Sequence, residues 1–174
     1  MIKNVEFKLA ETRGEIEESY SLVWSRYVEK NYLRDWPFDL WVTPYCLHPS
    51  TIVILATLEN KIVGTATVFR CNEMGLPLFN LCPEAKHIGM DIFEIGKLAV
   101  AKEMGDNIFS SVAGIGLIMG MFSVMYRCGL WFRENEFPNA DFDICIAVVP
   151  SHRPFYSLRR LIIPLQFTKC LRML

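Results

Sequence analysis

The stretch Phe93-Glu94-Ile95-Gly96-Lys97-Leu98-Ala99-Val100 decides how the rest of the chain is interpreted. Its residues are mostly apolar, and the run from 91 to 101 predicts a buried strand. Two charged side chains interrupt the stretch from 93 to 100, Glu94 and Lys97. Because side chains alternate along a strand, a spacing of three places these two on opposite faces unless a bulge intervenes.

Glu94 is the side chain of this strand best suited to catalysis. A carboxyl group among apolar neighbours has its pKa raised, and such a group can accept a proton near neutral pH as a general base. The alternative is a solvent-facing glutamate on one side of a half-covered sheet. The residues of the strand alone favour neither, so the role of Glu94 depends on its surroundings.

Strands and helices alternate along the chain on both sides of this segment. Two β-rich runs separated by Glu59-Asn60-Lys61 predict a hairpin. A long helix between two neighbouring strands suggests a mainly antiparallel sheet with one parallel pair, covered by helices, which is an α+β fold. The predicted order is β-α-β-β-β-α-β, with strands at 5–9, 51–58, 62–69, 91–101 and 143–149 and long helices at 13–30 and 107–128. Short helices are expected at 83–86 and 152–159, and a last apolar strand after them.

The length and composition indicate one globular domain. A chain of 174 residues is long enough for one hydrophobic core and short for two, so residues 1–174 are expected to form a single domain. Apolar residues make up 52% of the chain, which argues against disorder. The 18 basic and 19 acidic residues nearly balance, so there is no electrostatic reason to expect nucleic acid as a partner.

The six cysteines are scattered, without a C-x-x-C pair and without a histidine at metal-ligand spacing. No metal site is therefore expected, and reduced cysteines indicate a cytoplasmic protein. Residues 1–8 interrupt their apolar side chains with charges and lack the continuous apolar core of an export signal.

The segment from Asn107 to Tyr126 carries no charged side chain and is long enough to span a bilayer. A membrane-associated, non-catalytic protein is therefore one alternative. Serines and glycines dilute the hydrophobicity, which favours a buried core helix and no stable membrane insertion. At helical spacing, small residues fall on one face that could lie flat on a sheet: Ala113, Gly116, Gly120 and Ser123.

Two further candidates follow the strand predicted at 143–149, namely His152 and Tyr156. The phenol of Tyr156 could donate a proton to a leaving group. A tyrosine in a Pro-Phe-Tyr sequence more often serves packing, so this pattern by itself is weak.

The order of elements, together with Glu94-Ile-Gly-Lys-Leu-Ala-Val, resembles the GNAT superfamily of acyltransferases. More narrowly, four segments in order resemble the long-chain N-acyl amino acid synthases, which are relatives of the acyl-homoserine-lactone synthases: residues 20–30, 75–78, 94–100 and 150–156. The resemblance implies a three-layer α/β/α fold whose mixed, mainly antiparallel sheet is splayed at its centre. In that gap, between the strands at 93–100 and 143–149, the pantetheine arm of a thioester donor pairs with the backbone.

The activity that the resemblance implies is transfer of a long-chain acyl group from acyl carrier protein to the amino group of an amino acid. The donor substrate is then an acyl-phosphopantetheine thioester, and no bound cofactor is expected. Glu94 would take a proton from the amine, and Tyr156 would protonate the leaving thiolate. Backbone N–H groups near Ala99 and Val100 would polarise the thioester carbonyl. The implied substrate-binding residues are Lys97, Leu98, Ala99, Val100, Gly114, Gly116 and His152. A basic cluster is a candidate contact for an acidic carrier protein: Arg153, Arg159 and Arg160.

The chain departs from the related patterns at three places. Val23 and Leu33 stand where the lactone synthases carry arginine and tryptophan, which favours an amino acid over S-adenosylmethionine as acceptor. The segment from Ser111 to Gly116 lacks the basic or amide residue of a coenzyme A pyrophosphate loop, which agrees with a carrier protein as donor. After about residue 157 the usual closing strand pair is not evident, and Pro164 interrupts the apolar run from 161 to 174, so this part is expected to be atypical or truncated.

Two other functions stay as alternatives. One is a lactone synthase, and the other is an acetyl-coenzyme A-dependent N-acetyltransferase.

Overall fold

The computed structural model describes residues 4–33, 37–80, 83, 86, 92–105, 112–135, 143–146 and 163–165. The long elements are β1 (Val5–Leu9), α1 (Arg13–Glu29), β2 (Ile52–Leu58), β3 (Lys61–Arg70), β4 (Ile92–Val100), α2 (Val112–Asn135), β5 (Asp143–Ile146) and β6 (Ile163–Leu165). Short 3₁₀ turns accompany them: η1 (Pro44–Leu47), η2 (Pro77–Asn80) and η4 (Lys102–Met104). The predicted order of strands and long helices is confirmed.

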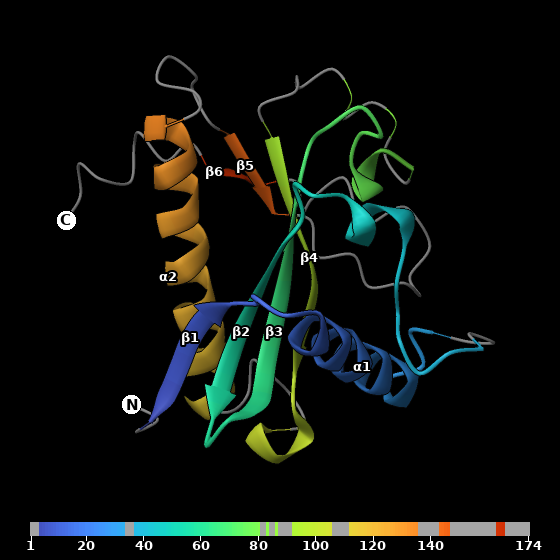
Figure 1. Cartoon of the computed structure of the whole chain (residues 1–174), viewed down its shortest axis with the longest axis vertical. Helices are drawn as coiled ribbons and strands as arrows, with labels where there is room; N and C mark the ends of the chain where they lie inside the picture. Colours follow the sequence, from blue (N-terminus) through green and yellow to red (C-terminus); the bar gives the residue numbers. More distant parts are fainter. Residues whose placement is uncertain are drawn as a thin grey trace.

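The described strands form one mixed sheet in the order β1-β2-β3-β4-β5-β6 (Figure 1). Neighbours pair antiparallel except β4 and β5, which run parallel. The parallel pairing joins Ile92–Glu94 to residues 143–145, whereas β4 continues to Val100. The mainly antiparallel sheet with one parallel pair is therefore confirmed, and among the described residues the β4–β5 pairing extends as far as Glu94.

Local sequence signals explain the start of α1 and the turn between β2 and β3. At the start of α1, the hydroxyl of Thr12 accepts from the backbone N–H of Glu15, and the Glu15 carboxylate accepts from the N–H of Thr12. This capping box satisfies N–H groups that have no partner inside the helix. Glu59 and Asn60 have φ of 51° and 64°, which is the left-handed geometry of a tight two-residue hairpin turn between β2 and β3.

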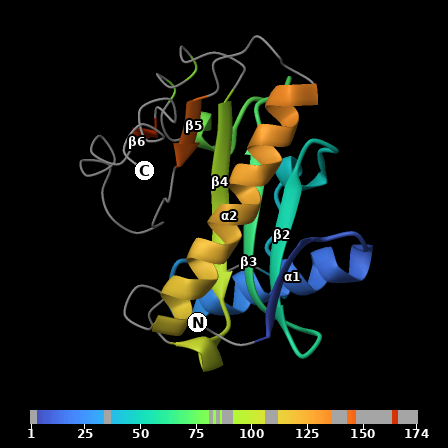
Figure 2. The ribbon, with the colours of Figure 1, turned by 90° about the vertical axis from the view of Figure 1, so that its left-hand side faces the viewer.

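The two helices lie on opposite faces of the sheet, α1 on one and α2 on the other (Figure 2). Side chains from β2, β3 and β4 pack under α2 against Leu117 and Met121. The other face packs Tyr20 of α1 against Val53 and Leu55. The three-layer α/β/α arrangement is thus confirmed, and the sheet separates two distinct interiors.

The buried side of α2 differs from the flat face of small residues that we expected. Gly116 and Ser123 are exposed, so that prediction is wrong for them. The helix instead buries larger residues against the sheet: Leu117, Ile118, Met121 and Met125. These side chains are core residues because large apolar groups bury more surface than small ones. None of the described helices combines the length and apolar character that crossing a membrane requires.

Gly120, a member of the expected small-residue face, makes close contact with a strand. A Cβ atom on Gly120 would lie 2.1 Å from Cζ of Phe7 in β1. The absence of a side chain at this position lets the Phe7 ring seat directly on the helix backbone. The contact fixes the distance between α2 and the edge of the sheet.

Candidate active site

A bulge in β4 settles the orientation of its two charged side chains. Thr67 lies opposite Gly96 and Thr65 lies opposite Ala99, so two steps along β3 match three along β4. Lys97 lies in this irregular stretch, with a φ of 49°. An extra residue in one strand shifts the alternation of side chains by one. Glu94 and Lys97 consequently face the same side of the sheet, the side of α1.

Glu94 is buried, with 5% of its surface exposed, so the alternative of a solvent-facing glutamate is wrong. One carboxylate oxygen, Oε2, accepts a hydrogen bond of 2.7 Å from the backbone N–H of Leu78. Burial raises the pKa of Glu94 to about 7, and the hydrogen bond from Leu78 opposes part of that rise. Within the described part of the chain, Oε1 has no hydrogen-bond donor. A carboxyl group with these properties can take a proton near neutral pH.

Lys97 is also buried, and aromatic rings surround its ammonium group. Its Nζ lies 4.7 Å from the ring centroids of both Tyr20 and Trp41 and donates to the backbone carbonyl of Trp41. Burial lowers the pKa of Lys97 from its usual range, while the nearby Cys46 thiol opposes the shift. The faces of aromatic rings attract a cation, so this environment holds the ammonium in one place without an acidic partner among the described residues.

The residues around Lys97 were not among the sequence-predicted site residues. Tyr20 belongs to the apolar face of α1, and Trp41 and Cys46 belong to the loop between α1 and β2. Trp41 also packs on Tyr27, with 5.0 Å between their ring centroids. The aromatic content of that loop was the signal that could have found Trp41, since such rings are usually buried when a loop is ordered.

Several hydroxyl and N–H groups near this site are buried without a hydrogen-bond partner among the described residues. The Tyr20 hydroxyl is one of them, and the Cys46 thiol lies close to it. The others are Trp24 Nε1, Thr65 Oγ1 and Thr67 Oγ1. Burying such groups without a partner costs free energy, so a hydrogen bond from each of them to a ligand or to a water molecule would be stabilising.

The remaining predicted substrate-binding residues are distributed over both faces. Leu98 accepts a 3.4 Å hydrogen bond from the hydroxyl of Tyr27 through its carbonyl, while Ala99 and Val100 are buried beside β3. Gly114 and Gly116 belong to α2, which covers the face opposite Glu94. His152 and Tyr156 lie outside the described residues, as do Arg153, Arg159 and Arg160.

The described residues contain no group of histidine, cysteine, aspartate or glutamate side chains arranged to hold a metal ion. The polar groups on this face of the sheet include the carboxylate of Glu94, the ammonium of Lys97, the hydroxyl of Tyr20 and the thiol of Cys46, a set suited to proton transfer and to binding a charged organic substrate.

Comparison with known proteins identifies the relatives of this chain. The family model of the N-acyl amino acid synthase FeeM matches residues 18–161. The solved structure of FeeM, an N-acyl amino acid synthase from uncultured soil microbes, superposes with a TM-score of 0.61 at 18% identity, covering 89% of this chain and 77% of that one. A comparison with curated proteins gave no match.

Two other solved structures share the fold. The acyl-homoserine-lactone synthase LasI superposes with a TM-score of 0.58 at 13% identity, covering 82% of this chain and 71% of that one. An aminoglycoside acetyltransferase from an uncultured soil metagenomic sample gives a TM-score of 0.50 at 14% identity, covering 91% and 85%. These likenesses show the GNAT-like α+β fold, and because the family model spans most of the chain, the protein belongs to the FeeM family of N-acyl amino acid synthases, which are acyltransferases.

Proposed function

We propose that Glu94 is the general base in the transfer of a long-chain acyl group from acyl carrier protein to the amine of an amino acid. The family implies an acyl thioester as donor and an amino acid as acceptor. The amine nitrogen attacks the thioester carbonyl, the C–N bond forms, and the C–S bond breaks. Glu94 takes a proton from the nitrogen, and the departing thiolate gains one, for which Tyr156 is the proposed donor. The observation that carries this proposal is the buried Glu94 carboxyl with its pKa of about 7.

The acceptor carboxylate would bind at Lys97. The bulge brings the Lys97 ammonium to the same face as Glu94, which supports an acceptor bound with its amine at the base and its carboxylate at the cation. The unpaired hydroxyl of Tyr20 beside Lys97 would donate a second hydrogen bond to that carboxylate. Binding the substrate would give the buried Tyr20 hydroxyl a stronger hydrogen-bond partner than the nearby Cys46 thiol, which contributes affinity.

The proposed donor is a carrier protein, supported by the sequence of the loop and first turns of α2. A coenzyme A donor carries a pyrophosphate that is usually held by backbone N–H groups next to a basic or amide residue, and Ser111 stands at that position. A carrier protein presents a single phosphate on its pantetheine, so it needs less of such a loop. Backbone N–H groups near Ala99 and Val100 would polarise the thioester carbonyl.

The test is an assay of the purified chain with a long-chain acyl carrier protein and a mixture of amino acids, with products identified by mass spectrometry. The expected result is N-acyl amino acid formation that falls by about a hundredfold or more in Glu94→Gln. The matched control is Glu6→Gln, an exposed glutamate of β1. Equal turnover by Glu94→Gln and wild type would exclude Glu94 as the base.

Substrates and variants of the site separate the finer parts of the proposal. Acyl-coenzyme A of the same chain length, offered in parallel, should react more slowly than the carrier-bound acyl group. Acetyl-coenzyme A as the sole accepted donor would instead indicate a small-molecule N-acetyltransferase, and product from S-adenosylmethionine would indicate a lactone synthase. Tyr20→Phe should raise KM for the amino acid with little change in kcat, whereas Tyr27→Phe, which removes a hydroxyl bonded to a main-chain carbonyl, should not.

A further inference from the structure

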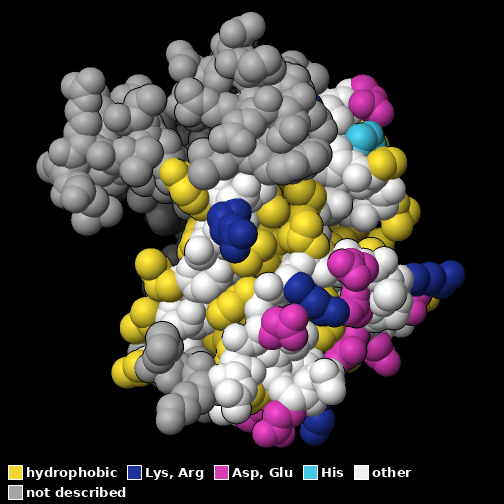
Figure 3. All heavy atoms as spheres, turned by 60° about the vertical axis from the view of Figure 1, so that its left-hand side comes forward, with side chains coloured by type: hydrophobic (Ala, Val, Ile, Leu, Met, Phe, Trp, Pro, Cys, Tyr) yellow, Lys and Arg dark blue, Asp and Glu magenta, His cyan; other side chains and the backbone are white. Residues whose placement is uncertain are grey.

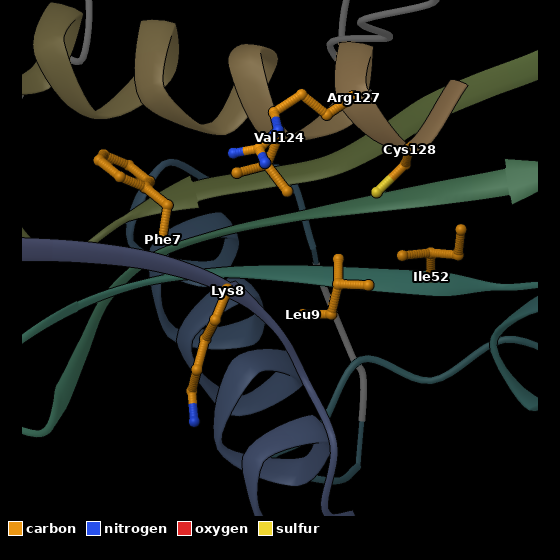
Figure 4. A pocket seen from close by; sticks show the side chains of 7 residues that line it. All are labelled: Phe7, Lys8, Leu9, Ile52, Val124, Arg127 and Cys128. Carbon is orange, nitrogen blue, oxygen red and sulfur yellow. The ribbon is translucent and has the colours of Figure 1, made fainter. Parts of the chain in front are cut away.

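A cavity lies on the face of the sheet opposite Glu94, between the sheet edge and α2 (Figure 4). Its volume is about 690 Å³, within the range of about 300 to 1,000 Å³ that small-molecule sites occupy. The lining residues come from β1, β2 and the second half of α2: Phe7, Lys8, Leu9, Ile52, Val124, Arg127 and Cys128. We refer to this cavity as the β1–α2 groove.

The walls of the groove are apolar on both sides. In Figure 4 the side chains of Phe7, Leu9 and Ile52 lie on the helix side of the sheet, facing those of Val124 and Cys128. Lys8 points the other way, toward α1, where it pairs with Glu15. The contact of Phe7 with Gly120 brings the strand and helix close together beside the groove. Burial raises the pKa of the Cys128 thiol, so this side chain stays neutral.

One cation lies at the border of these apolar walls. Arg127 projects from α2 and is exposed, and no acidic side chain of the described residues pairs with it. Figure 3 shows the same side of the molecule, where hydrophobic side chains form a band across the surface with basic side chains at its border. An apolar trough whose described lining offers one cation without an acidic partner, Arg127, matches a molecule that has an alkyl chain and one negative charge.

We propose that the β1–α2 groove binds a long-chain carboxylate, with the alkyl chain between β1 and α2 and the carboxylate on Arg127. Two sources share this chemistry, a free fatty acid and an N-acyl amino acid. The second is the product of the proposed function, so its assignment rests on that function, whereas the ligand class rests on the groove alone. Because Glu94 and Lys97 face the other side of the sheet, the groove is a separate site from the acyl-transfer centre.

The test measures binding of dodecanoate, N-dodecanoylglycine and dodecanol to the purified chain by calorimetry, each below the concentration at which it forms micelles. Dodecanoate should bind with an affinity that rises about fourfold for each added methylene. Leu9→Trp fills the groove from a side chain that is 39% exposed and should abolish binding, with Ile52→Trp as a second variant. The matched control is Leu47→Trp, at a position 77% exposed and outside the groove.

Arg127→Gln tests the charged end of the site. It should weaken binding of the two carboxylates by about threefold to fivefold and leave dodecanol unchanged, because a partly exposed ion pair contributes little more than that. Lys61→Gln, an exposed cation at the hairpin, should have no effect. Preferential binding of N-dodecanoylglycine over dodecanoate would identify the product as the ligand, and equal or weaker binding would identify a fatty acid site.

Two results would overturn the proposal. One is dodecanoate binding that survives both Leu9→Trp and Ile52→Trp in folded protein, as judged by circular dichroism. The other is loss of dodecanoate binding in Glu94→Gln, which would show that the alkyl chain of the ligand binds in the acyl-transfer centre. Failure of the proposed function can be told apart from failure of this proposal. A protein that has no acyltransferase activity but still binds dodecanoate in the groove would keep the fatty acid site, and only the N-acyl amino acid would be excluded as its ligand.

Discussion

Glu94 combines two properties that oppose each other in a folded protein. It occupies the centre of a sheet, where burial raises its pKa to about 7, and it has a hydrogen bond from Leu78 that favours the charged form. A carboxylate kept from water in this way is a better proton acceptor than an exposed one, but ionising it costs folding free energy. The same residue therefore predicts one effect on rate and another on stability.

The rate of acyl transfer should depend on the ionisation of Glu94. Only the carboxylate can accept a proton, so kcat/KM should rise with pH and level off above about 7. The measurement is a pH profile of kcat/KM with a saturating donor. Glu94→Asp keeps a carboxyl group, so its residual kcat/KM should also rise with pH. The residual kcat/KM of Glu94→Gln should not change with pH over this range. A flat wild-type profile from pH 5 to 9 would contradict the assignment.

The stability of the chain should depend on the same ionisation. The pKa of Glu94 is about 7 when folded and 4.5 as the ordinary value, so between these the folded state holds a proton that the unfolded state has lost. The contribution of Glu94 to the free energy of unfolding is present in full below pH 4.5 and falls as the pH rises to about 7. Above that pH it stays constant, and the total decrease is about 3 kcal/mol. Glu94→Gln lacks this loss. Urea unfolding at pH 5 and 8 should show the variant gaining on wild type at the higher pH, and parallel values would contradict the prediction.

At the scale of elements, the packing of α2 on β1 depends on Gly120. Its missing side chain admits the Phe7 ring, and a Cβ there would lie 2.1 Å from that ring. The large apolar residues that the helix also buries, Leu117, Ile118, Met121 and Met125, can adjust by changing rotamers. The glycine cannot be replaced without moving either the ring or the helix.

Gly120→Ala should therefore destabilise the fold by about 1 to 3 kcal/mol, as overpacking usually does. The matched control is Gly14→Ala in the first turn of α1, where a Cβ would meet nothing within 4 Å. Alanine there should stabilise the protein by about 0.4 to 1 kcal/mol, because it restricts the unfolded chain and favours helix. Denaturant unfolding of the two variants gives the comparison. Equal effects of the two substitutions would show that the Phe7 contact is not limiting.

At the scale of the whole molecule, the sheet divides the protein into two interiors with different content. The α2 side is an apolar core that ends in the β1–α2 groove, and the α1 side holds the buried charges of Glu94 and Lys97. The central strands β2 and β3 have helices on both faces, whereas β1 is at an edge and only partly buried. Local opening should cost least where burial is least.

Hydrogen exchange should follow this gradient. We expect the slowest amides in β2 and β3, whose residues from Val53 to Ala56 and from Val63 to Phe69 are buried, and faster exchange in β1. The measurement is exchange followed by mass spectrometry of peptides from each strand. Protection of β1 equal to that of β3 would show that the molecule opens only as one unit.

Much of this architecture was predictable from the sequence because its signals are local. The hairpin between β2 and β3, the start of α1 at Thr12 and the order of elements follow from alternation, capping and turn residues that lie within a few positions of each other. The family was likewise predictable, since its motifs are short segments in a fixed order. The wrong prediction, the flat face of α2, came from assuming that small residues mark the buried side of the helix.

The site required the tertiary structure, because its parts are distant in sequence. Sequence alternation left open which way Lys97 faces, and only the pairing of β4 with β3 shows the bulge that turns it to the face that carries Glu94. The ring of Tyr20, the ring of Trp41 and the N–H of Leu78 reach these two side chains from other elements. Periodicity reports on neighbours along the chain, whereas burial, the pKa of Glu94 and the groove opposite it arise from contacts between segments that only folding brings together.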